Sequence, residues 1–149
     1  MNTDWIDEAT GYHCRMWDGG RNLCGYVAVP TDHPLYDKGY SHEIEKPEDF
    51  ESQPVGKRGA INLFTMGLAL EHGMVRVSDY FDVHGSLTFG AAIKDAPARW
   101  YFGFDCAHHG DTRDRCDETY VRAECATLAK QLKDYAEAWR ARRIARSAD

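Results

Sequence analysis

Long apolar runs are absent from this chain of 149 residues. No stretch approaches the roughly 18–20 apolar residues that a membrane-spanning helix needs. The first residues include Asp4, Asp7 and Glu8 and lack the apolar segment of a secretory leader. We therefore expect no membrane association and no export, which places the protein in the cytoplasm.

The usual short signatures of metal and nucleophile chemistry are also missing. The chain has no C-x-x-C pair, no H-E-x-x-H and no G-x-S-x-G turn. Its five cysteines are odd in number and do not resemble a secreted disulfide framework. We expect reduced, buried thiols, and we predict neither a metal nor any other cofactor.

An excess of positive charge is lacking as well. Lys and Arg total 18 against 24 Asp and Glu, a net charge of -6. This balance argues against binding to a nucleic-acid polymer, because that affinity comes largely from neutralising phosphates. The charge is uneven, since residues 120–149 carry +3 and the remainder carries -9. A small phosphate-bearing ligand would therefore need locally placed arginines.

Hydrophobic residues (43%) are sufficient for a packed core. We predict a single α+β domain over residues 1–149, with a mainly β body (1–116) and a long C-terminal helix (117–146). The body would hold an antiparallel sheet of about four to six strands. Residue patterns predict strands at 11–17, 23–29, 74–77, 80–89 and 99–105. Residues 41–59 fit a surface connection with a helical turn at 47–50, and 60–70 fit either helix or strand.

The C-terminal helix is predicted from one apolar stripe with steps of three and four residues. Its members are Val121, Cys125, Leu128, Leu132, Tyr135 and Trp139. Asp117 is placed to cap the first turn, and residues 140–146 form a basic end beyond the stripe. Two interpretations of this end stay open: a solvated terminus, or a contact that joins copies of the chain into a homo-oligomer.

Polar side chains gather where the strand at 99–105 ends, because Asp105, Cys106, His108, His109 and Asp111 follow within seven positions. The strand at 80–89 would carry His84, Ser86 and Thr88 on one face. If the two strands pair, His84, Thr88, Tyr101 and Asp105 meet on one surface. Gly103 would leave room there for a flat ligand against Tyr101.

Several chemistries fit these residues. A metal site could use the carboxylates and histidines of the cluster, although their spacing matches no standard signature. Ser86 with His84, or Cys106 with His108, could act as nucleophile and base, and the histidines could serve in acid–base chemistry. Each residue could instead cap a turn or fill a structural role. A pocket for a nucleotide-like molecule is the interpretation we favour, with non-catalytic binding. Its predicted lining is Tyr12, Tyr26, His84, Thr88, Trp100, Tyr101, Asp105, His108 and Asp111, with Arg15, Arg21, Arg76 and Arg99 available to phosphate.

Ordered sequence blocks cover most of the chain except the acidic connection. They are Gly11-Tyr12-His13-Cys14, Leu23-Cys24-Gly25-Tyr26-Val27 with Val29-Pro30 and His33-Pro34, Val83-His84-Gly85-Ser86-Leu87-Thr88-Phe89, Trp100-Tyr101-Phe102-Gly103-Phe104-Asp105-Cys106-Ala107-His108 with Gly110-Asp111, and Tyr120-Val121 with Glu124 and Leu128-Ala129. Together they resemble a family of small proteins, mostly uncharacterised, that phages and prophages encode. Ser86 departs from the second glycine expected there, and Trp100-Tyr101 from an expected Trp pair.

This resemblance implies a context and no catalytic residue. A small phage-encoded protein of this kind can counter host immunity, so we expect it to bind and sequester a nucleotide-derived immune signal in the host cytoplasm. One alternative is a hydrolase or lyase that degrades such a signal with the same His and Asp residues. Another is a protein that inhibits a host defence component directly through its surface.

Overall fold

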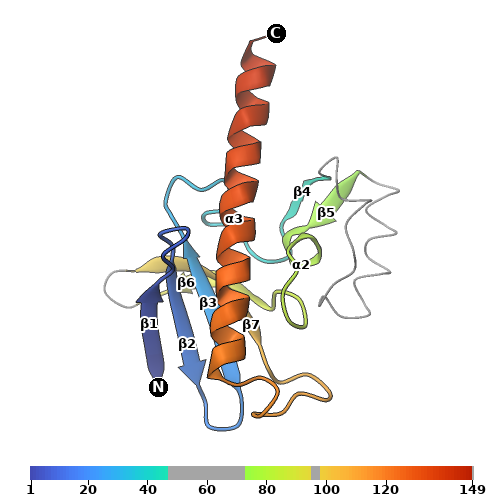
Figure 1. Cartoon of the computed structure of the whole chain (residues 1–149). Coiled ribbons are helices and arrows are strands. Elements are labelled where there is room, and N and C mark those ends of the chain that lie inside the picture. The colour runs from blue at the N-terminus through green and yellow to red at the C-terminus, as the bar shows by residue number, and fades with distance from the viewer. Residues whose placement is uncertain (47–72, 95–97, 149) are drawn as a thin grey trace.

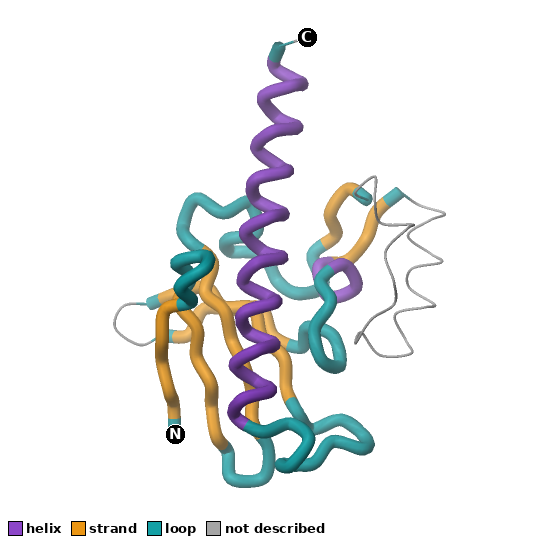
Figure 2. The backbone as a smooth tube through the Cα atoms, in the orientation of Figure 1, coloured by secondary structure: helices purple, strands orange, loops and turns teal. Residues whose placement is uncertain are grey.

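A five-stranded antiparallel sheet and one long helix form most of the structure, a computed structural model that describes residues 1–46, 73–94 and 98–148 (Figure 1). The strand order is β1-β2-β3-β7-β6. The strands are β1 (Asn2–Ile6), β2 (His13–Asp18), β3 (Leu23–Val29), β7 (Arg99–Asp105) and β6 (Phe89–Ile93). The helix α3 (Glu118–Ser147) lies across one face of this sheet (Figure 2). The predicted α+β class and antiparallel sheet are confirmed.

The centre of the sheet is the pair β3 and β7, both predicted with their observed bounds. Their register places Val29 opposite Trp100 and Cys24 opposite Asp105, so the pair runs the full length of the sheet. Strands β2 and β3 form the predicted hairpin, in which the backbone N–H of Gly20, at φ 91°, donates to Asp18 Oδ1 at 2.8 Å. Strand β1 extends this hairpin to the edge and was not predicted.

Helix α3 begins as the sequence predicts. The Asp117 side chain accepts the Tyr120 N–H at 2.8 Å, which caps the first turn. The stripe from Val121 to Tyr135 is buried, and Trp139 is partly buried at its end. At Gly25 the helix approaches the sheet so closely that a Cβ would meet the Phe104 ring and Cys125 Sγ. Burial of this stripe against β2 and β3 therefore holds the helix to the sheet.

The other face of the sheet is filled by its own side chains. The Tyr26 ring lies over Gly103, where a Cβ would collide with it, and makes an edge contact with Tyr101 at 6.3 Å. The Arg15 guanidinium sits 5.5 Å from the Tyr101 ring centroid, and Tyr101 itself is fully buried. The space that the sequence predicts for a flat ligand at Gly103 is thus occupied by Tyr26, and that expectation is wrong.

A small second sheet joins β4 (Glu43–Glu45) and β5 (Met74–Arg76), followed by the short helix α2 (Val77–Tyr80). The predicted strand at 80–89 is wrong. Its first residue ends α2, and residues 81–88 are irregular because Gly85 and Ser86 turn the chain at φ 68° and 72°. The pairing with β7 starts at Phe89 instead. The ambiguous stretch 60–70 and the turn at 47–50 lie outside the described residues.

The C-terminal end of α3 extends beyond the sheet (Figure 1). Ile144 is 69% exposed there, while Arg143 covers the Trp139 ring at 4.6 Å and Arg146 pairs with Glu45 at 3.2 Å. The helix is rich in charge, and within the described ranges no helix combines the length and apolarity needed to cross a bilayer.

Candidate functional site

Five side chains from three separate segments converge beside the first turn of α3. We call them the His84 cluster: His84, Cys106, Asp111, Cys116 and Tyr120. His84 comes from the irregular segment before β6, and Cys106 directly follows β7. Asp111 and Cys116 lie on the loop that leads to α3, and Tyr120 lies in the first turn of the helix. The cluster therefore forms only when the end of β7 and the start of α3 are both in place.

The His84 ring is contacted at both nitrogens. Its Nδ1 lies 2.9 Å from Tyr120 Oη. Its Nε2 lies 2.9 Å from each carboxylate oxygen of Asp111 and 3.6 Å from Cys116 Sγ. One ring nitrogen, with one proton or one lone pair, cannot satisfy three such neighbours at once. Nε2 is therefore a point on which several metal-ligating atoms converge.

Backbone hydrogen bonds fix the two loops that carry these groups. The N–H of His84 donates to Glu124 Oε1 at 3.0 Å, and Glu124, on the buried face of α3, is only 2% exposed. The N–H of His108 donates to Asp111 Oδ2 at 2.9 Å, and the Asp111 N–H donates back to the His108 carbonyl at 2.9 Å. The carboxylate is thus held toward His84 by its own loop.

The charges of the cluster depend on burial. Burial raises the pKa of the Asp111 carboxyl, but hydrogen bonds from His84 and the His108 backbone outweigh it, so this pKa is lowered overall. Burial also raises the pKa of the Cys116 and Cys106 thiols, with the Asp111 carboxylate adding to the effect on both. Burial, followed by the Glu124 carboxylate, raises the pKa of the Tyr120 hydroxyl. An anionic Asp111 therefore faces neutral thiols and a neutral phenol.

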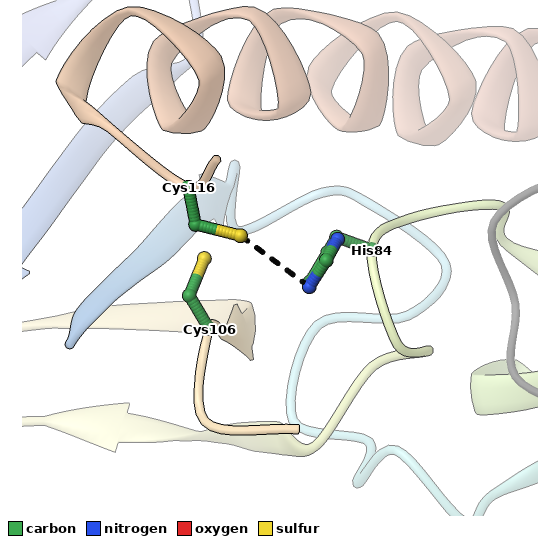
Figure 3. A group of neighbouring side chains, drawn as sticks. All are labelled: His84, Cys106 and Cys116. Carbon is green, nitrogen blue, oxygen red and sulfur yellow. Dashed lines mark hydrogen bonds between the residues drawn. The ribbon is translucent and has the colours of Figure 1, made fainter. Parts of the chain in front are cut away.

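The cluster suits metal binding better than nucleophilic catalysis. A nucleophile–base–acid chain needs the acid on the ring nitrogen away from the nucleophile, whereas Asp111 and Cys116 both approach Nε2. By contrast, one ligand atom each from His84, Cys106 and Cys116 lies within 4.8 Å of the others (Figure 3).

Asp105, Thr88 and His108 lie beside this cluster. Thr88 Oγ1 donates to Asp105 Oδ2 at 2.9 Å, so these two predicted neighbours do meet. His108 Nε2 lies 3.4 Å from Asp105 Oδ1, within ion-pair range but without hydrogen-bond geometry. The His108 ring fills the space above Gly85. The structure thus brings together the five predicted polar residues His84, Thr88, Asp105, His108 and Asp111, while His109 is exposed.

The four predicted aromatic residues lie elsewhere. Tyr26 and Tyr101 pack on the sheet face opposite α3. Trp100 Nε1 donates to the Lys38 carbonyl at 2.9 Å, near the far end of β7. Tyr12 lies at that same end, in one pocket lining with Arg99, and β7 separates Arg99 from Asp105 by six strand steps, or about 20 Å. Polar and aromatic residues therefore do not surround one common ligand position.

Tyr12 lines a groove of about 410 Å³ at this far end of the sheet, which we call the Tyr12 groove. Its walls are the turn before β2, the end of β3 and the start of β7. The lining residues are Thr10, Gly11, Tyr12, His13, Ala28, Val29, Pro30, Thr31, Tyr36, Ala98 and Arg99. His13 Nε2 lies 2.8 Å from Asp4 Oδ1, and this carboxylate also accepts from Arg15 Nε at 2.8 Å. The Arg15 hydrogen bond is the main cause of the lowered pKa of Asp4.

Sequence reasoning missed the roles of several residues in and around the His84 cluster. Cys116 was expected only as a buried thiol, and Cys106 was considered as a nucleophile but not as a metal ligand. All five cysteines are buried and free of disulfides. The signal for Cys106 and Cys116 was position, since they bracket a loop that also contains two histidines and Asp111. Tyr120 and Glu124 could have been found from the i, i+4 spacing that places them on one face of α3. No protein-family model, curated protein or solved structure matches this chain.

Proposed function

We propose that the protein binds a nucleotide-like small molecule in the Tyr12 groove and retains it unchanged. The observation that carries this proposal is a groove of about 410 Å³ that combines Tyr12, Tyr36 and Arg99. Ligand sites usually occupy roughly 300–1,000 Å³ and are mainly apolar with a few polar groups. The size and the lining of the groove both fit that description.

The lining offers each kind of contact that a nucleotide needs. A base can stack on a tyrosine ring, which gives affinity with little sequence preference. A guanidinium such as that of Arg99 can bind phosphate oxygens through two parallel hydrogen bonds. A local cation matters here because the chain outside residues 120–149 carries a net charge of -9. Arg99 would supply attraction that the body as a whole does not.

Retention of the ligand is favoured over its chemical conversion because most of the acid–base side chains lie away from the Tyr12 groove. His84, Asp105, His108 and Asp111 gather at the opposite end of β7 from the groove. Hydrolysis or elimination in the groove remains the second candidate because His13, paired with Asp4, lines it. In that case His13 would act as the general acid or base.

The biological role that follows is counter-defence. The resemblance to phage and prophage proteins suggests a host cytoplasm as the place of action, where sequestration would lower the free concentration of a nucleotide-derived immune signal. A third possibility is direct inhibition of a host defence protein through the surface of this protein. These roles differ in one measurable respect, which is the fate of the small molecule.

The test is a depletion assay with cyclic nucleotides and ADP-ribose derivatives. Each is mixed with excess protein and filtered, and the protein is then heat-denatured and the released molecules are analysed by mass spectrometry. Recovery of the intact molecule supports sequestration, and recovery of an altered one supports catalysis. Absence of depletion across the panel overturns both in favour of a protein target.

Variants locate the site. Tyr12→Ala and Arg99→Gln should abolish retention, whereas Tyr40→Ala and Arg21→Gln, on exposed residues outside the groove, should not. Asp105→Asn tests the other end of β7. Loss of retention in Asp105→Asn with full retention in Tyr12→Ala would refute the groove and place the ligand beside the His84 cluster.

A further inference from the structure

We propose that His84 Nε2, Cys106 Sγ, Cys116 Sγ and a carboxylate oxygen of Asp111 bind one zinc ion. The site is distinct from the Tyr12 groove, so it stands or falls independently of the proposed ligand. Three of the donors already lie within 4.8 Å of one another (Figure 3), and Asp111 is 2.9 Å from the histidine donor. Two thiolates, one imidazole and one carboxylate are a donor set typical of zinc.

One of the donor separations matches tetrahedral coordination directly. With Zn–S near 2.3 Å and Zn–N near 2.05 Å, a tetrahedral angle separates sulfur from nitrogen by about 3.6 Å. The observed separation of Cys116 Sγ and His84 Nε2 is 3.6 Å. A nitrogen and a carboxylate oxygen on the same ion should lie about 3.3 Å apart. The Asp111 oxygens, at 2.9 Å, would move outward by about 0.4 Å when the metal replaces the direct hydrogen bond.

The second ring nitrogen of His84 is prepared for the same role. When Nε2 donates its lone pair to a metal, Nδ1 must hold the proton and donate it to an acceptor. Tyr120 Oη is that acceptor, at 2.9 Å, and the Asp117 cap fixes the turn that carries Tyr120. The Tyr120 hydroxyl therefore orients His84 without touching the metal.

The electrostatics also favour the zinc-loaded site. Zinc with two thiolates and one carboxylate has a net charge of -1, and Cys116 directly precedes the N-terminal cap of α3, where a negative charge is favoured. Zinc binding would displace the protons of the two thiols, so affinity should rise with pH.

The arrangement is that of a structural site. Asp111 would fill the fourth position, and the side chains of Asp111 and His84 are only 10% and 19% exposed. Catalytic zinc sites keep one position open for water, whereas structural sites are closed. The ion would join the segment before β6, the end of β7 and the start of α3, which are otherwise held by hydrogen bonds such as that from His84 N–H to Glu124.

The first experiment measures metal binding by the full chain under reducing conditions. Metal-free protein is titrated with Co²⁺ and then with Zn²⁺. We expect one Co²⁺ per chain with thiolate charge-transfer absorption, and displacement of this Co²⁺ by one Zn²⁺. Cys106→Ala and Cys116→Ala should each lose part of that absorption and weaken zinc binding by more than about 100-fold. Loss of a residue that only hydrogen-bonds to a ligand already weakens metal binding by about 10–100-fold.

Matched variants separate ligation from folding. Cys24→Ser, at a buried cysteine of β3 outside the donor group, should keep full stoichiometry. Tyr120→Phe should keep the thiolate absorption and weaken zinc binding by about 10-fold. Equal loss of binding in Cys24→Ser and Cys116→Ala would overturn the proposal.

Alkylation of the wild-type chain tests the site without any substitution. Zinc should protect Cys106 and Cys116 from a thiol reagent and leave Cys14, Cys24 and Cys125 unchanged, as read by peptide mass spectrometry. Absence of cobalt or zinc binding in the reduced wild type refutes the proposal. So does protection that spreads equally over all five cysteines, and so does a Cys106–Cys116 disulfide in protein handled under reducing conditions.

Discussion

Acidification should destabilise the fold through His33, a buried histidine on the turn after β3. His33 is only 3% exposed and is bonded at both nitrogens. Its Nδ1 accepts the Leu35 N–H at 3.0 Å, so Nε2 carries the proton and donates to the Leu132 carbonyl at 2.8 Å. A second proton on Nδ1 would oppose the Leu35 N–H. The ring is thus held in its neutral form.

The sign of the effect follows from its pKa. Burial lowers the pKa of His33 below the ordinary value of 6.5; the Leu132 carbonyl opposes this shift and Arg140 adds to it. Below pH 6.5 the unfolded chain therefore takes up a proton that the folded chain resists. The contribution of His33 to stability is complete above pH 6.5 and falls as the pH drops toward the lowered folded pKa.

An upper limit on the magnitude comes from the unfolded state alone. At about pH 5.5, one unit below the ordinary pKa, a histidine that stays neutral in the fold loses at most about 1.4 kcal/mol of stability. For a chain of this size that loss lowers the melting temperature by roughly 3–6 °C. Urea unfolding of wild type and His33→Gln from about pH 7.5 to about pH 5.5 measures it.

Comparing the pH dependence of stability in wild type and His33→Gln isolates the contribution of His33, because the other titrating groups are the same in both proteins. His33→Gln should lose less stability on acidification than the wild type, by up to about 1.4 kcal/mol. His109→Gln, at an exposed histidine, should match the wild type. Parallel stability curves for wild type and His33→Gln would refute the reasoning.

Three further predictions test other parts of the fold. Leu128→Ala, at the fully buried centre of the α3 stripe, should lower the free energy of unfolding in urea by about 2–5 kcal/mol, and a loss below about 1 kcal/mol would contradict the packing described. Gly85→Ala should lower the free energy of unfolding by more than Gly11→Ala does. Both glycines have positive φ, but only at Gly85 would the new Cβ collide with His108. Equal losses would contradict that contact. Light scattering should show a multiple of 16.9 kDa for wild type, through the exposed end of α3, and 16.9 kDa for Ile144→Glu; a monomeric wild type would leave that end solvated.

Elements with strong local patterns were predictable from the sequence. Strand β3 shows little alternation of buried and exposed residues, because both of its faces are covered. Its β-branched residues and the turns on either side nevertheless indicated its bounds. The α3 stripe spans five turns, so its period could not be mistaken. Strands β1 and β4 were missed because an edge strand and a three-residue strand bury few side chains.

The candidate site was predictable only in part. Alternation at 82–88 suggested a strand, but Gly85 and Ser86 place this segment in a turn, and His84 faces helix α3 rather than a sheet surface. His84 and Asp111 were found because their residue types are informative. Neither Cys106 nor Cys116 was predicted as a metal ligand, because a thiol in a core cannot be told from a thiol in a donor set until its neighbours are known.

The β3–β7 register also bears on the order of folding. The hairpin of β2 and β3 closes four residues, whereas Val29 and Trp100 are brought together across about seventy. Loop closure of that length is less favourable by about 2.5 kcal/mol, at about 0.6 kcal/mol for each doubling. The N-terminal strands should therefore pair early, and β7 should dock late. Because the Tyr12 groove takes Tyr12 from the early part and Arg99 from the late part, it exists only once folding is complete.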